Sequence, residues 1–305
     1  MMNLEFKKAT LEDRELIQDY LMKYPSRSCE RCFSNVFLWS RKYNVTWGMV
    51  ENTLVFKTEN EERMAFTYPA GRSEDIKKAI TALRAYCKER GRAFGLYCVT
   101  PEYFERLNRM FPDTFQIEYE RDDADYVYES EKLITLAGKK LHGKRNHINK
   151  FKALYEGRWA YETMTKENIE DCFQMQFEWR HLNEVDEDPD KRYELAVVQN
   201  ALRLFSELGF KGGLIRIDGK VVAFTMGEAL TKDTFCVHFE KALADVEGAY
   251  PMINQQFVEH ECASFKYINR EEDTGAEGLR KAKLSYKPVF LVEKGFVTEI
   301  EKKDF

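Results

Sequence analysis

The chain has 305 residues, of which 44% are hydrophobic and 32% charged, which is the composition of an ordinary folded protein. This length suits two domains or one large one and excludes a single small module. The net charge of −5 argues against a nucleic-acid coat protein. No apolar run is long enough to cross a bilayer, and the N-terminus lacks the apolar stretch of a signal peptide. We therefore expect a cytoplasmic protein without integral membrane association.

The first half of the chain predicts a mixed unit of strands and helices. Thr10 is a candidate helix cap, and Ser73 precedes a helix that stops at Gly91. A turn at Glu51 and Asn52 joins two strands into a hairpin. In chain order, we predict a strand at 4–9, a helix after Thr10, a hairpin over 44–58, a strand at 63–70, a helix at 74–90, a strand at 93–99, a helix at 101–110 and a strand at 114–120.

The second half predicts the same kinds of element in the same order. Its hairpin turns at Asp218 and Gly219. In chain order, we predict a strand at 158–164, a helix opened by Thr165, a helix at 193–208, a hairpin over 212–230, a strand at 233–240, a helix from Pro251, a strand at 265–269, a helix at 277–284 and a strand over 290–300.

Two local similarities predict an internal duplication. Residues 4–17 resemble 159–172, and the hairpin around Asn52 resembles the one around Gly219. The charged, non-periodic segment 121–131 is the expected boundary. We therefore predict a first domain over 1–125 and a second, carrying the active site, over 126–305.

The seven cysteines do not predict a disulfide framework, because their number is odd and no secretion signal is present. Cys29 and Cys32 form one C-x-x-C pair, but a structural zinc site needs four ligands and no second pair has suitable spacing. We expect reduced thiols and no metal, and leave open the role of these two cysteines.

Residues 264–288 are the most distinctive segment. A strand ends at Asn269, a polar cluster that includes Arg270, Glu272 and Asp273 follows, and a helix with Lys281 and Lys283 begins after Gly275. Ligands bind where strands end and helices begin, because free N–H groups and the helix dipole converge there. The alternative is that Asp273 only caps the helix.

This segment resembles the signature of a bacterial family related to the C-terminal domain of phosphatidylglycerol lysyltransferase. GKVVAFTMGEAL, VHFEKA and GAYPMINQQF carry the same pattern within residues 213–290. That family is similar to paired GNAT (N-acyltransferase) folds and to the Fem-type aminoacyltransferases. The resemblance implies an α/β (α+β) fold of two tandem GNAT-like domains, each a mixed, mostly antiparallel sheet flanked by helices, with an acyltransferase site in the second.

Four residues are candidate catalysts in that fold. Alternation along strand 233–240 places Cys236, His238 and Glu240 on one face, so that His238 or Glu240 could accept a proton from an attacking amine. Asp273 is a second candidate acceptor, and Tyr286 occupies the place of a tyrosine that protonates the leaving group. The alternatives are a core histidine, a Glu240 paired with Lys241, and a Tyr286 that only bridges two elements.

The turn before Pro251 would replace the pyrophosphate loop of acyl-CoA enzymes. Gly248 and Ala249 permit close backbone approach, while Tyr250 and Asn254 could contact the donor or acceptor. The loop lacks the usual pattern of acyl-CoA enzymes, so acyl-CoA and aminoacyl-tRNA both remain possible cosubstrates. No covalently bound cofactor is expected.

Residues 133–155 contain no acidic residue. Fem-like enzymes carry a similar basic helix, which Lys144, Arg145 and Asn146 resemble, so residues 139–152 could contact tRNA or another polyanion. A solvated helix face is the alternative. The acidic stretch 183–194 could attract a cationic substrate or be an exposed loop. The predicted function is transfer of an aminoacyl or acyl group to an amine, a hydroxyl or a lipid headgroup, and the alternative is a non-catalytic module that binds a small ligand.

Overall fold

The computed structural model describes residues 4–61, 63–182 and 188–301, and it divides into two compact units. The first unit comprises residues 1–125 and 292–305, and the second comprises residues 126–291. The predicted second domain, 126–305, is therefore wrong at its end, because the last strand of the chain is hydrogen-bonded within the first unit.

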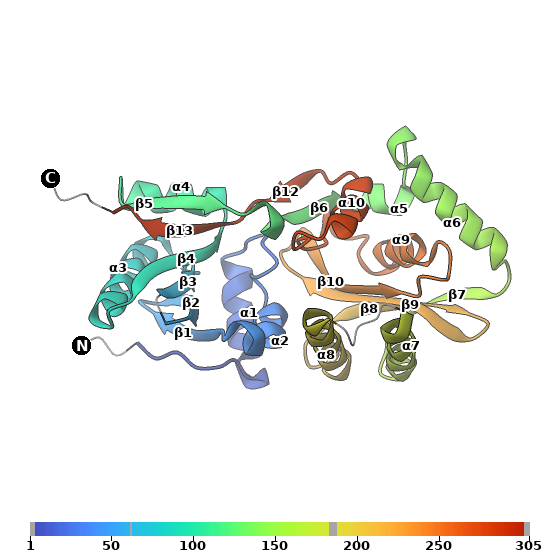
Figure 1. The fold of residues 1–305 in the computed structure, drawn as a ribbon, viewed down its shortest axis with the longest axis horizontal. Coiled ribbons are helices and arrows are strands. Elements are labelled where there is room, and N and C mark those ends of the chain that lie inside the picture. Colours follow the sequence, from blue (N-terminus) through green and yellow to red (C-terminus); the bar gives the residue numbers. More distant parts are fainter. Residues whose placement is uncertain (1–3, 62, 183–187, 302–305) are drawn as a thin grey trace. The chain divides into compact units, whose positions relative to one another are not determined.

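The first unit is a six-stranded sheet with the order β1-β2-β3-β4-β13-β5 (Figure 1). Helix α3 packs on it through small and aliphatic side chains spaced three and four residues apart, among them Ile76, Ile80 and Leu83. Its strands are β1 Thr46–Val50, β2 Thr53–Glu59, β3 Arg63–Thr67, β4 Ala93–Val99, β5 Phe115–Tyr119 and β13 Gly295–Glu299. Its helices are α1 Arg14–Lys23, α2 Phe33–Tyr43, α3 Ser73–Glu89 and α4 Pro101–Met110, with short 3₁₀ turns at Leu11–Asp13 and Arg121–Asp123.

The second unit is a seven-stranded sheet with the order β12-β6-β11-β10-β9-β8-β7. Within this unit, α9 covers one face with α5 and α6 beside it, and α7 and α8 lie on the opposite face (Figure 1). Its strands are β6 Asp125–Glu129, β7 Trp159–Thr163, β8 Lys211–Ile217, β9 Lys220–Ala229, β10 Thr234–Ala242, β11 Tyr267–Asn269 and β12 Phe290–Val292. Its helices are α5 Ser130–Thr135, α6 His142–Leu154, α7 Ile169–Leu182, α8 Pro189–Arg203, α9 Ala249–Glu261 and α10 Glu277–Ser285, with a 3₁₀ turn at Lys139–Leu141.

The two sheets follow one plan. Each has an antiparallel hairpin, then a third strand, then a fourth strand parallel to the third. The parallel pair is β3 with β4 in the first sheet and β10 with β11 in the second. In each, a strand from elsewhere in the chain lies antiparallel to the fourth strand: β13 beside β4, and β6 beside β11. This shared order is what the predicted duplication would produce, with the inserted strands supplied by distant segments.

Several predicted segments differ from the structure. The strand expected over 4–9 is only one isolated bridge, between Lys7 and Trp47. The first unit gives way to the second between Asp125 and Tyr126, within the boundary segment expected over 121–131, but this segment is not a linker. It contains the inner strand β6, whose residues Tyr126, Val127 and Tyr128 are buried on both faces. The single strand expected over 290–300 is two strands in two sheets, β12 and β13. The helix expected over 193–208 is α8, which begins at Pro189 because the Asp188 side chain accepts hydrogen bonds from the N–H groups of Asp190 and Lys191.

The acidic stretch predicted over 183–194 is only partly within the structure. Residues 183–187 lie outside the described residues, and residues 188–194 form the cap and first turns of α8. Among residues 4–61, 63–182 and 188–301, no helix is both long and apolar enough to cross a bilayer.

Candidate functional site

The parallel strands β10 and β11 diverge in the middle of the second sheet. They pair over three residues, ending at Cys236 opposite Asn269, and β10 then continues to Ala242 paired with β9 but not with β11. The chain after Asn269 turns into the segment 270–275 before α10. Side chains from the part of β10 beyond Cys236 meet this segment, and we call this region the fork.

A β-bulge at His238 changes the faces of β10. Val237 lies opposite Gly227 of β9 and Phe239 lies opposite Met226, so His238 is the extra residue. Since opposed residues of an antiparallel pair share a face, Glu240 lies on the face of Val237, and Phe239 lies on the face of Cys236. The predicted shared face for Cys236, His238 and Glu240 is therefore wrong, because simple alternation takes no account of a bulge.

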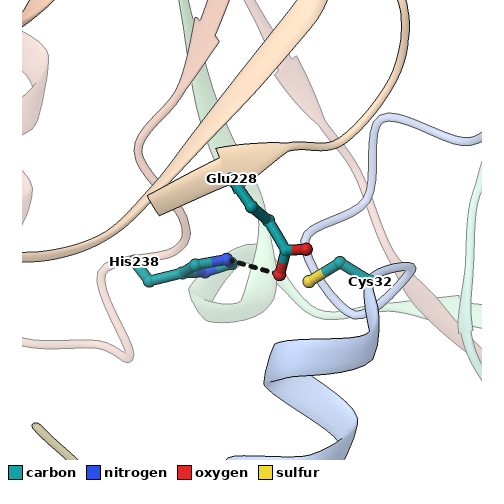
Figure 2. Close-up of side chains that lie close together, drawn as sticks. All are labelled: Cys32, Glu228 and His238. Carbon is teal, nitrogen blue, oxygen red and sulfur yellow. Dashed lines mark hydrogen bonds and ion pairs between the residues drawn. The ribbon is translucent and has the colours of Figure 1, made fainter. Parts of the chain in front are cut away.

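His238 is held between two carboxylates. Its Nε2 lies 3.2 Å from Oε1 of Glu228 on β9, and its Nδ1 lies 2.8 Å from Oε1 of Glu271 (Figure 2 shows the contact with Glu228). Cys236 Sγ is 3.7 Å from Nδ1 of the imidazole and 3.8 Å from Oε1 of Glu271. The histidine side chain is 1% exposed and that of Glu271 is 20% exposed, so the imidazole is enclosed and the cluster reaches the surface at Glu271.

Glu240 lies on the opposite face and makes two hydrogen bonds within the fork. Its Oε1 accepts from the Arg270 guanidinium at 2.8 Å, and its Oε2 accepts from Nδ2 of Asn254 on α9 at 3.0 Å. Lys241 instead pairs with Glu194 at 2.6 Å, so the alternative in which Glu240 pairs with Lys241 is wrong. Among the described residues, Nη1 of Arg270 and Oδ1 of Asn254 are buried and have no hydrogen-bond partner. These atoms offer one free donor and one free acceptor next to Glu240.

Tyr286 and Lys144 complete this face of the fork. The Arg270 guanidinium lies 4.8 Å from the centre of the Tyr286 ring, and Nζ of Lys144 lies 4.1 Å from it. Burial raises the pKa of the Tyr286 phenol above its usual value, although Arg270 opposes part of this effect. Burial and the neighbouring Arg270 lower the pKa of Lys144. Tyr286 therefore keeps its proton at neutral pH and remains a hydrogen-bond donor.

The segment after β11 is fixed by hydrogen bonds to its backbone. Oδ1 of Asn269 accepts from the N–H of Glu271 at 2.7 Å. Nζ of buried Lys283 donates to the carbonyl oxygens of Arg270 at 2.6 Å and Glu271 at 3.1 Å, and to that of Glu272. Lys283 and Asn269, both predicted to bind a ligand, are used here to hold the loop. Lys281, predicted to do the same, lies on the exposed side of α10.

Asp273 is fully buried and its carboxylate is saturated with donors. It accepts from the Arg280 guanidinium at 2.7 Å and 2.8 Å, from the Tyr126 hydroxyl and from the N–H of Gly275 at 3.0 Å. The hydrogen bonds from Arg280 hold the pKa of this carboxyl well below its usual value. These contacts make Asp273 an anchor for the loop and leave Glu240 as the carboxylate that faces the unfilled donor and acceptor.

The start of α9 does not offer a row of free N–H groups. The N–H of Ala249 donates to Val246 and that of Met252 donates to Gly248, while Pro251 has none. Of the first four positions, only Tyr250 keeps a free backbone N–H in this part of the described chain. A Cβ on Gly248 would lie 2.7 Å from the carbonyl oxygen of His147, so the α6 backbone packs directly against this glycine.

The residues of the basic segment 139–152 make different contacts. Arg145 donates to the carbonyls of Leu136 and Gly138 beyond the end of α5, and Asn146 contacts His142 on the helix surface. Lys150 pairs with Glu247 at 2.6 Å. Lys144 turns inward to Tyr286. The remaining lysines of the predicted surface are exposed: Lys139, Lys140 and Lys152.

Glu228, Glu271 and Tyr128 lie at the fork but were not predicted as site residues. Glu228 depends on the register of β9 with β10, and Tyr128 belongs to β6, a strand that the sequence pattern did not indicate. Glu271 lies in the polar cluster after Asn269 and has a positive φ of 58°, which no sequence signal marks in a glutamate.

Comparisons with solved structures identify the fold. A protein of unknown function from Bacteroides thetaiotaomicron is 37% identical, with 98% of this chain and 100% of that chain covered and a TM-score of 0.92. The C-terminal domain of a lysylphosphatidylglycerol synthetase, described as putative, from Agrobacterium fabrum is 14% identical, with 94% and 91% covered and a TM-score of 0.68. FemX is 8% identical, with 97% of both chains covered and a TM-score of 0.61.

The chain thus has a tandem GNAT-like fold of the kind seen in FemX. It belongs to the family described as phosphatidylglycerol lysyltransferase, C-terminal, which it matches over residues 22–296. An uncharacterised protein of Mycoplasmoides gallisepticum is 23% identical over 178 residues, which are 58% of this chain and 56% of that protein. The chain therefore aligns with about half the length of this curated relative.

Proposed function

We propose that this protein transfers an acyl or aminoacyl group from an activated donor to an amine or hydroxyl acceptor at the fork of the second unit. The observation that carries the proposal is the position of Glu240 on the diverging strand β10. There Glu240 faces Arg270 and Asn254, with Tyr286 and Lys144 beside it. Membership of a family named for a lysyltransferase supports transfer as the type of reaction.

Each of these groups suits one step of acyl transfer. The acceptor attacks the donor carbonyl carbon, and Glu240 receives its proton. Arg270 and Lys144 stabilise the negative oxygen of the tetrahedral intermediate, because Nη1 of Arg270 has a free N–H. The bond to the leaving oxygen or sulfur then breaks, and Tyr286 supplies the proton. Asn254 holds Glu240 and offers its own Oδ1 to the acceptor.

We favour an aminoacyl-tRNA over an acyl-CoA as the donor. An acyl-CoA needs several backbone N–H groups for its pyrophosphate, and at the start of α9 those of Ala249 and Met252 are used within the protein while Pro251 has none. The exposed lysines 139, 140 and 152 give a surface suited to backbone phosphates. The acceptor is an amine, which Glu240 and Asn254 would bind, or the headgroup of phosphatidylglycerol, by analogy with the family.

The experiment incubates the purified full chain with labelled aminoacyl-tRNA or labelled acetyl-CoA. Each donor is tested with small amines and with phosphatidylglycerol vesicles, and products are separated by chromatography. We expect label to pass from the aminoacyl-tRNA only. Lys139→Glu with Lys140→Glu should weaken tRNA binding, most strongly at low salt. Label transfer from acetyl-CoA instead would overturn the choice of donor.

The variant that tests the fork itself is Tyr286→Phe, with Tyr155→Phe at the end of α6 as its control. We expect Tyr286→Phe to lower the transfer rate at least about tenfold and Tyr155→Phe to leave it unchanged. Saturable ligand binding with no product from either donor would instead support the non-catalytic binding module.

A further inference from the structure

The opposite face of β10 carries a cluster that the proposed transfer does not use. Cys236, His238 and Glu271 place a sulfur, a ring nitrogen and a carboxylate oxygen within 4.8 Å of one another. The strand supplies the first two and the loop after β11 supplies the third. Cysteine, histidine and glutamate are together the ligand types that Zn²⁺ and Co²⁺ accept.

The separations of these atoms fit a tetrahedral ion. Bond lengths of about 2.3 Å to sulfur and about 2.1 Å to nitrogen or oxygen require about 3.6 Å between sulfur and each lighter ligand, and about 3.4 Å between nitrogen and oxygen. The observed distances from Sγ of Cys236 are 3.7 Å to Nδ1 and 3.8 Å to Oε1. Nδ1 and Oε1 are 2.8 Å apart, so a small rotation of the Glu271 side chain would complete the geometry.

Glu228 supplies the support that metal-binding histidines require. Its Oε1 lies 3.2 Å from Nε2 of His238, the ring nitrogen that faces away from Cys236. A proton held on Nε2 by this carboxylate leaves the lone pair of Nδ1 directed toward the other two ligands. Figure 2 shows the Glu228 carboxylate at the edge of the imidazole ring.

The backbone positions the ligands at some cost in strain. The bulge at His238 brings its ring to the face of Cys236, so the two side chains meet although they are two residues apart on an irregular strand. Glu271 has a φ of 58°, in the left-handed region that a non-glycine residue seldom occupies. Its N–H and carbonyl are fixed by Asn269, Tyr126 and Lys283. This geometry preorganises Glu271 toward His238.

We propose that Cys236, His238 and Glu271 bind one tetrahedral transition-metal ion, with Zn²⁺ as the expected occupant and Glu228 as the residue that orients the histidine. Binding exchanges the thiol proton of Cys236, and any proton on Nδ1, for the metal and releases them to solvent. Three protein ligands leave a fourth position for water or another small ligand. Glu271, whose side chain is 20% exposed, gives the ion a path from the surface.

The test uses the full chain without an affinity tag, treated with a chelator and then titrated with Co²⁺. We expect one equivalent to bind and to give the thiolate-to-cobalt charge-transfer band of a sulfur ligand together with the visible bands of a tetrahedral site. Zn²⁺ should displace the Co²⁺, and elemental analysis of the Zn²⁺ form should give one zinc per chain.

Variants assign the ligands. Cys236→Ser should abolish the charge-transfer band, while Cys262→Ser, a buried cysteine of the same unit outside the cluster, should keep it. Glu228→Gln should weaken binding about 10- to 100-fold without removing the band. If circular dichroism shows that Cys236→Ser does not fold, Glu271→Gln takes its place, because it changes the partly exposed ligand. The proposal fails if the wild-type chain binds no Co²⁺, or if binding and its spectrum survive Cys236→Ser and Glu271→Gln.

Discussion

The parallel strand pairs at equivalent places in the two sheets differ in length and chemistry. In the first unit, β3 and β4 stay paired over five residues, and Met64, Phe66 and Leu96 join the apolar core. In the second, β10 and β11 pair over only three residues before they diverge. Charged side chains then occupy the fork on both faces. One plan thus gives a parallel pair that lies in the apolar core of the first unit and a fork lined by buried polar atoms in the second.

Both units bury charged residues, but they do so differently. In the first unit, Nζ of Lys294 lies 2.5 Å from Glu30 and 2.7 Å from Asp125, and the lysine side chain is 1% exposed. This lysine directly precedes β13, so its ion pairs hold the end of the chain in the first sheet. In the second unit, Arg270 and Asn254 keep unfilled polar atoms beside Glu240. We infer that the first cluster stabilises the fold and that the fork serves function.

Lys294→Met should have the largest effect on stability, because it leaves the buried carboxylate of Asp125 and the partly exposed carboxylate of Glu30 without their cation. We expect a loss of about 4 kcal/mol in the free energy of unfolding, measured by urea denaturation. Lys220→Met, which breaks an exposed pair with Glu178, should cost less than about 1 kcal/mol. Equal effects of the two variants would show that the Lys294 cluster does not hold the fold.

Asp273→Asn should destabilise the protein by about 3 kcal/mol at pH 7, because the buried Arg280 contact loses its charge. The pKa of Asp273 is lowered in the folded state, so its contribution is present above the unfolded value of about 3.9. That contribution is lost as the pH falls through the lower folded pKa.

Urea unfolding at pH 7 and at pH 3 measures this dependence. The difference between wild type and Asp273→Asn should shrink in acid. A difference that stays constant between the two pH values would mean that the charge of Asp273 is not what stabilises the loop.

Gly227→Ala should perturb the fork by overpacking. A Cβ at this position would lie 1.9 Å from the carbonyl oxygen of Cys236, so β9 or β10 must move. We expect a loss of about 2 kcal/mol in stability, with lower transfer activity. Gly143→Ala on α6, where a Cβ meets nothing within 4 Å, should be neutral or slightly stabilising. If both variants behave alike, the close approach at Gly227 does not shape the fork.

The sequence predicted the parts of this fold that depend on local patterns. Both hairpins and helix α3 follow from turn residues and periodicity, although α3 begins at Ser73 itself and is capped by Arg72. The segment after Asn269 was recognised as the place where a strand gives way to a helix. The faces of His238 and Glu240 could not be predicted, because the bulge depends on pairing with β9. Strand β6 was missed because buried residues on both faces give no alternation, and acidic neighbours surround it.

Partners across the fork also depend on tertiary structure. Glu240 is 30 residues from Arg270 and 14 from Asn254, so only the folded sheet shows that they meet. For the basic segment, the sequence indicated more than the structure shows. Its composition indicated one charged surface, but capping of α5 by Arg145 and the turn of Lys144 toward Tyr286 leave only part of it exposed.

The most direct test of the central claim compares one neutralised glutamate in each unit. The transfer rate is measured for Glu240→Gln and Glu30→Gln at a temperature where circular dichroism shows both folded. We predict that Glu240→Gln slows transfer at least about 100-fold, while Glu30→Gln lowers stability but keeps the wild-type rate. A wild-type rate for Glu240→Gln, or a loss of transfer confined to Glu30→Gln, would contradict the assignment of function to the fork.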